Sequence, residues 1–118
     1  MDYKYDLKTQ QEINSIISHI KVWKNLFSIN LEYFVDGWAL YLREKTLYPR
    51  LIVVFKNEDY FSIKSFEIHF MVYKETYKEL YKIEKIYDAE EMIKELKAII
   101  YGKDVINSTY QKYLNFFG

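Results

Sequence analysis

The sequence predicts an α+β fold: a two-layer sandwich with an N-terminal helix, a four- or five-stranded antiparallel β-meander and two C-terminal helices. Apolar residues recur at helical spacing before residue 28 and after residue 88, and β-branched and aromatic residues fill much of the stretch between. Short polar turns divide that middle stretch, which is typical of neighbouring antiparallel strands. The 118 residues are enough for one hydrophobic core, so we expect residues 1–118 to form a single α+β domain.

The N-terminal helix is predicted to begin at Thr9, because Thr9-x-x-Glu12 matches a capping box. Residues 1–8 precede it as a loose lead-in, and the helix is expected to end near Ser28. Its apolar stripe consists of Ile13, Ile16, Ile17, Ile20, Trp23 and Phe27. This stripe identifies the side of the helix that packs on the sheet.

The segment Asn30–Arg43 is predicted to form a β-hairpin around Asp36-Gly37, because a type I′ turn needs positive φ at both central residues. A turn there aligns three apolar pairs: Val35 with Trp38, Tyr33 with Leu40, and Leu31 with Leu42. Directly opposed residues share a face, so one face of the hairpin is apolar and the other combines aromatic and charged residues. We expect the helices to cover the apolar face.

Two strands are expected after the hairpin. Pro49 sets the turn into Leu51–Phe55, an apolar run on both faces that is typical of a central strand. In the next candidate, Tyr60–Tyr73, the alternation changes parity, which predicts a β-bulge near Lys64-Ser65. The bulge would direct four side chains away from the helices: Glu67, His69, Met71 and Tyr73.

Residues 74–87 fit either a helix or an exposed edge strand rich in Lys and Glu, and we favour a turn followed by a strand. Asp88 is predicted to cap the first C-terminal helix, which Gly102 ends. The apolar stripe of this helix is Met92, Ile93, Leu96, Ile99 and Ile100. Asp104 is predicted to cap the second C-terminal helix, with the apolar side Ile106, Tyr110, Tyr113, Leu114 and Phe117.

Composition excludes several classes of protein. The absence of cysteine excludes a disulfide framework and a thiolate metal site. The N-terminus is charged and polar, unlike a secretory signal, and no apolar run approaches the ~20 residues of a membrane span. These features favour a location in the cytoplasm. A net charge of zero provides no overall attraction to nucleic acid or anionic lipid.

Aromatic residues make up 19% of the chain, with 13 Tyr and 8 Phe. Aromatic residues are enriched at protein interfaces. However, all but two of the 17 Lys and Arg residues are Lys, and Gly and Pro are scarce, as expected from AT-rich codons. We therefore attribute most of the tyrosine excess to an AT-rich genome, such as that of a low-GC bacterium or one of its mobile elements.

The sequence contains few candidates for catalysis. Its three glycines are far apart and form no phosphate-binding loop. Glu67 and His69 would share a strand face and are a candidate acid/base pair, although an ordinary polar pair on an outer sheet face is the favoured interpretation. Glu58-Asp59 is interpreted as a turn and not as a metal site. We expect no enzymatic activity, no catalytic or metal-binding residue and no cofactor.

The outer face of the sheet is the predicted partner-binding surface, because contiguous exposed aromatic patches mark binding sites. The candidate residues are Glu32, Phe34, Tyr41, Arg43, Glu67, His69, Met71 and Tyr73. The alternative is that the last helix wraps to this side and buries the patch.

These features predict a small non-enzymatic protein-binding module that inhibits a partner by occlusion. Immunity proteins, antitoxins and phage-encoded inhibitors of bacterial defence nucleases act in this way, so the partner would be a toxin or a nuclease. One alternative is a single-stranded nucleic-acid binder that stacks bases on the sheet aromatics, but Glu32, Glu67 and the zero net charge argue against it. A binder of a small apolar ligand and a homodimer through the sheet face are further alternatives.

Overall fold

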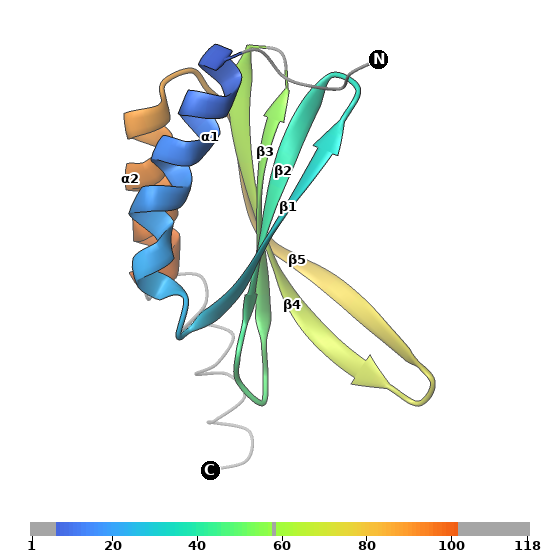
Figure 1. The fold of residues 1–118 in the computed structure, drawn as a ribbon. Helices are drawn as coiled ribbons and strands as arrows, with labels where there is room; N and C mark the ends of the chain where they lie inside the picture. The colour runs from blue at the N-terminus through green and yellow to red at the C-terminus, as the bar shows by residue number, and fades with distance from the viewer. Residues whose placement is uncertain (1–6, 58, 102–118) are drawn as a thin grey trace.

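A computed structural model describes residues 7–57 and 59–101 of the chain (Figure 1). The elements are, in order, α1 (Leu7–Ile20), the 3₁₀ turn η1 (Lys21–Trp23), β1 (Phe27–Phe34), β2 (Gly37–Glu44), β3 (Arg50–Asn57), β4 (Tyr60–Met71), β5 (Lys74–Ile86) and α2 (Ala89–Tyr101). The five strands form one antiparallel sheet in the order β1-β2-β3-β4-β5. Both helices lie on the same face of this sheet, which confirms the α+β class (Figure 1). The predicted second C-terminal helix, starting at Asp104, lies outside the described residues.

The α1 helix is displaced from its predicted bounds at both ends. It already includes Leu7, so Thr9 lies inside the helix and does not cap it. It ends at Ile20, and a hydrogen bond from the Lys24 N–H to the Lys21 carbonyl at 3.1 Å tightens the chain into a 3₁₀ turn. Phe27, which was expected on the helical stripe, therefore reaches the core as the first residue of β1.

The β1–β2 hairpin turns at Val35-Asp36, one residue earlier than predicted. Tyr33 opposes Trp38 in the resulting register, so the predicted residue pairs are wrong. Moving the turn by one residue moves each residue's partner on the opposite strand by two positions. Because side chains alternate with period two, a two-residue change of partner leaves every side chain on the same face. The apolar face of β2 is therefore as expected, whereas Val35 lies in the turn with 87% of its surface exposed.

Gly37 is required at this hairpin by a close approach and not by a positive φ. A Cβ atom at this position would lie 1.9 Å from the backbone carbonyl oxygen of Lys56 in β3. No glycine among the described residues has positive φ. The turn prediction thus identified the correct hairpin for the wrong physical reason.

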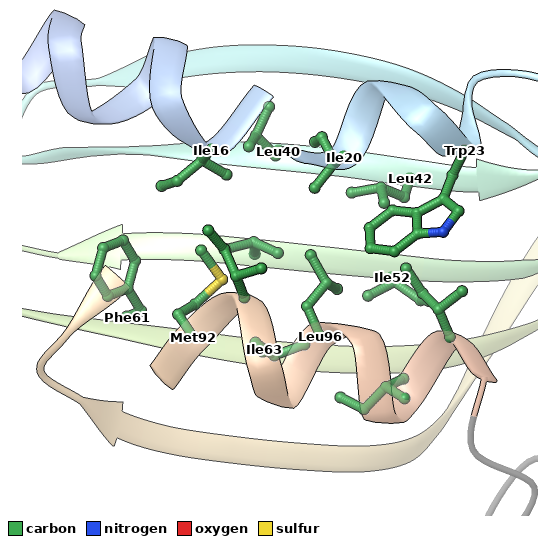
Figure 2. Close-up of a cluster of buried hydrophobic side chains, with 14 of the residues drawn as sticks. Ile16, Ile20, Trp23, Leu40, Leu42, Ile52, Phe61, Ile63, Met92 and Leu96 are labelled. Atoms are coloured by element: carbon green, nitrogen blue, oxygen red, sulfur yellow. The ribbon is translucent and has the colours of Figure 1, made fainter. Parts of the chain in front are cut away.

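The core lies between the helices and the face of the sheet that they cover (Figure 2). α1 contributes Ile16 and Ile20, and α2 contributes Met92 and Leu96, all of which are fully buried. The sheet contributes one side chain in two from the middle strands: Trp38, Leu40, Leu42, Ile52, Val54, Phe61 and Ile63. Trp38 packs edge-to-face on Phe61, with ring centroids 6.1 Å apart.

The α2 helix has the predicted start and the predicted apolar stripe. The Asp88 carboxylate accepts a hydrogen bond from the Glu91 N–H at 3.4 Å, as expected of an N-cap. At the other end, Arg50 donates to the Ile99 carbonyl at 3.2 Å. Arg50 also pairs with the Glu44 carboxylate at 2.9 Å, so one side chain fixes the C-terminus of α2 to the sheet.

Trp38→Ala should lower the free energy of unfolding by about 3–5 kcal/mol, because it empties the centre of the core. Urea denaturation followed by circular dichroism measures this change. Val35→Ala is the control, since Val35 is exposed in the turn and its truncation should leave stability within about 0.5 kcal/mol. A wild-type-like unfolding curve for Trp38→Ala would contradict the placement of its side chain.

Gly37→Ala should destabilise the protein by about 1–3 kcal/mol, although the backbone conformation at Gly37 is open to any residue. The added methyl group meets the Lys56 carbonyl, and two paired strands have to separate to accept it. Asp36→Ala, one residue earlier in the exposed turn, controls for the change to alanine. Equal unfolding midpoints for the two variants would show that the close approach is absent.

Candidate binding surface

The face of the sheet opposite α1 and α2, called here the outer face, carries no helix within the described residues (Figure 1). Alternation from the core residues of β2 places Glu32, Phe34, Tyr41 and Arg43 on this face. These four predicted site residues therefore lie on adjacent strands of one face. The remaining four predicted residues do not join them.

The predicted bulge near Lys64-Ser65 is absent from β4. Its ladder with β3 is continuous, from Arg50 opposite Glu67 to Asn57 opposite Tyr60. The irregularities lie in β5 instead, where two register shifts leave one extra residue at each point. With no bulge in β4, Glu67, His69 and Met71 have the parity of the helix-covered face, and the outer face receives Phe66, Ile68 and Phe70.

His69 and Glu67 form an exposed pair, with the His69 Nε2 atom 2.8 Å from the Glu67 carboxylate. The two residues are only two positions apart in one strand, as the sequence interpretation had it. Within the described residues, no cluster of three or more His, Asp or Glu side chains is arranged to hold a metal ion. The pair is thus a local contact on the side of the sheet away from the outer face.

The β4–β5 hairpin extends beyond β3 as an arm (residues 68–77). β3 begins at Arg50 opposite Glu67, and the Ile68 N–H donates to the Pro49 carbonyl at 3.1 Å, so only the residues of β4 after Ile68 pair with β5 alone. The arm diverges from the body of the protein at the lower right of Figure 1. Its tip consists of four consecutive apolar residues that are largely exposed: Phe70 (61%), Met71 (57%), Val72 (78%) and Tyr73 (100%).

Tyr73 has a φ of 74°, in the left-handed region that favours glycine. This conformation costs about 1–2 kcal/mol for a residue with a side chain. The side chain gains no burial in exchange, because Tyr73 is fully exposed. A bulky aromatic residue thus occupies a turn position where glycine would suit the fold better.

Arg43, Glu75 and Tyr77 connect the arm to the outer face. Both terminal nitrogens of Arg43 donate hydrogen bonds to the Glu75 carboxylate, and the Tyr77 hydroxyl donates to the same carboxylate at 2.7 Å. These hydrogen bonds hold the pKa of Glu75 below its ordinary value, with Arg43 as the main cause and Tyr77 as the second. Sequence reasoning identified Arg43 but missed Glu75 and Tyr77, which lie 32 or more residues further along the chain.

Tyr41 and Glu32 form a second polar contact on the outer face. Partial burial is the main cause that raises the pKa of the Tyr41 hydroxyl, followed by the charge of Glu32 and a hydrogen bond to it. The hydroxyl is the donor and the carboxylate the acceptor in this hydrogen bond. Both residues come from the hairpin that the sequence identified.

An open hollow of about 270 Å³ lies at the β1–β2 turn end of the outer face. Phe34, Phe55 and Tyr60 contribute to its wall, together with Lys64 and Glu84. The Lys64 ammonium lies 5.5 Å from the centre of the Phe55 ring. Such a hollow matches one inserted side chain or a small ligand better than a whole polymer.

The charges of the outer face do not form a basic stripe. Its cations are Arg43, Lys64 and Lys82, and its carboxylates are Glu32, Glu75, Glu79 and Glu84. Arg43 is paired with Glu75, and Lys82 lies 2.9 Å from Glu84. A phosphate backbone would have to compete with these carboxylates for every paired cation.

Comparisons with known proteins found no protein-family model, no curated protein and no solved structure that match this chain. None of the helices in the described ranges is long and apolar enough to cross a membrane.

Arg43→Gln should raise the pKa of Glu75 toward its ordinary value, and Tyr77→Phe should raise it by less. The pKa is depressed in the folded state, so this pair stabilises the fold above the ordinary carboxyl pKa and loses that contribution as pH falls through the lowered value. NMR titration of the glutamate carboxyl carbons measures the shift. Glu84, whose pKa is lowered mainly by Lys82, is an internal control that should not respond to either substitution. An unchanged Glu75 titration in Arg43→Gln would show that the pair does not persist in solution.

Proposed function

We propose that this chain is a small non-enzymatic protein-binding module, and that it inhibits its partner by occlusion. Its contact surface comprises the outer face and the tip of the arm. The observation that carries the proposal is the tip itself: four consecutive exposed apolar residues that end in Tyr73, held in a left-handed conformation. Exposed apolar patches of this kind mark interaction sites.

The arm and the outer face suit a partner surface with both a recess and a ridge. The aromatic and methionine side chains at the tip have the composition of interface hot spots, which insert into pockets of the partner. The hollow beside Phe34 and Phe55 would accept a side chain from the opposite direction. Binding at both places would cover an extended area of the partner without any chemical step.

The mixed charges of the outer face favour a protein partner over nucleic acid. Paired cations and carboxylates fix orientation and reject wrong partners at protein interfaces. A toxin or a nuclease, blocked at its working surface in the cytoplasm, remains the partner class that the composition and the small size of the chain favour.

Tyr73→Gly should raise stability and weaken partner binding, two effects of opposite sign. Glycine relieves the left-handed strain and should add about 0.5–1 kcal/mol to the free energy of unfolding after its own entropic cost. The loss of the aromatic ring should weaken binding by on the order of tenfold or more. Denaturation and quantitative affinity capture from a low-GC bacterial lysate measure the two effects.

Lys85→Gly is the matched control, because Lys85 is the other described non-glycine residue with positive φ, at 60°, and lies in β5 away from the tip. It should gain stability and keep its partner. The double variant Phe34→Asp with Tyr41→Asp tests the outer face in the same capture, beside Val22→Asp with Leu47→Asp, two exposed residues elsewhere. Equal capture by wild type and Tyr73→Gly, or retention of nucleic acid in place of protein, would overturn the proposal.

A further inference from the structure

The two edge strands of the sheet, β1 and β5, differ in how readily a further strand could pair with them. β5 is rich in Lys and Glu and contains two register shifts, both of which prevent another strand from pairing with it. β1 has neither feature: its eight residues pair with β2 without interruption, and Glu32 is its single charged residue. Within the described ranges, β1 pairs with β2 alone. Among the strands in the described part of the chain, β1 is therefore the edge better suited to strand addition, in its first half around Ile29 and Leu31.

The register shows which backbone groups of β1 point away from β2. Just before the strand, the Lys45 N–H donates to the Leu26 carbonyl at 2.9 Å, and these two residues continue the register in which Phe27 opposes Glu44. Hydrogen-bonded pairs alternate along an antiparallel ladder, so even-numbered residues of β1 bond to β2 and odd-numbered residues point outward. Ile29 and Leu31 thus direct their N–H and C=O groups outward, where they meet no partner in the described chain.

We propose that β1 pairs with β1 of a second copy of this chain, in antiparallel orientation, so that two five-stranded sheets join into one. The outward groups are backbone donors and acceptors in alternation, and an extended strand is the occupant that satisfies them. A twofold axis at Asn30 places Ile29 opposite Leu31 of the second copy, and Leu31 opposite Ile29. Both side chains are half-buried at the margin of the core, and the second copy would cover their exposed parts.

The charge of Glu32 disfavours one of the neighbouring registers. An axis at Glu32 would place two carboxylates directly opposite each other, which is unfavourable. An axis at Asn30 opposes two amides, which donate and accept reciprocally, and places the Glu32 carboxylate opposite the Ser28 hydroxyl. The inference is independent of the proposed function, because the outer face and the arm stay accessible in such a dimer.

Asn30→Cys tests the dimer and its register together. The chain contains no cysteine, and Asn30 is exposed, so the substitution introduces a single thiol at no cost to the core. In the proposed register the two Asn30 Cα atoms form a non-hydrogen-bonded pair at about 4.5 Å, within the range that a disulfide spans. We expect wild type to have twice the monomer mass by light scattering, and oxidised Asn30→Cys to form a covalent dimer nearly completely at micromolar concentration.

Ser28→Cys is the matched control on the same strand. In the proposed register its two copies lie four residues apart along the strands, or about 13 Å, too far for a disulfide. Asn30→Asp, which opposes two carboxylates at the axis, should raise the dimer dissociation constant on the order of tenfold or more, with an unchanged circular dichroism spectrum. A monomeric wild type at high concentration, or equal cross-linking of Ser28→Cys and Asn30→Cys, would overturn the proposal.

Discussion

Burial of one face of the sheet beneath two helices is the constraint on which the rest of the structure depends. Five side chains of β2, β3 and β4 are completely excluded from solvent there: Leu40, Leu42, Ile52, Val54 and Ile63. The helices meet each other over these central strands, and α2 also contacts β4 and β5. A layer of this width leaves the side of β1 that faces away from β2, and the distal part of β4–β5, beyond its margins. The surfaces available for binding are therefore a consequence of where the helices end.

The fold class could be predicted from the sequence because its two periodicities are well separated along the chain. The hairpin shows where that reasoning stops. A two-residue error in register leaves each side chain on its correct face, so Trp38 was placed correctly although its partner was not. Gly37 is compatible with both a left-handed turn and a close backbone approach, and only the position of Lys56 in the neighbouring strand distinguishes them.

The candidate surface was predicted only in part. A change of parity along β4 has two physical explanations: a bulge, or a straight strand whose buried side changes as the hairpin leaves the helices. The structure has the second, with Ile68 buried at 4% on the outer face. The contact of Arg43 with Glu75 depends on how the arm lies relative to β2. The position of the arm is set by tertiary structure, and the local sequence around Arg43 or Glu75 contains no pattern that predicts their contact.

A comparison of the two described residues with positive φ supports the proposal that the tip of the arm is a contact site. At Lys85, the left-handed residue lies at a register shift in β5, after which Ile86 opposes Phe61 and is buried at the edge of the core. The backbone cost there is offset by burial within the same molecule. At Tyr73 the same cost of about 1–2 kcal/mol has no such compensation, because the ring is fully exposed. A fold optimised for its own stability would place glycine at this turn, so in our proposal a partner's contact with the aromatic ring provides the compensation.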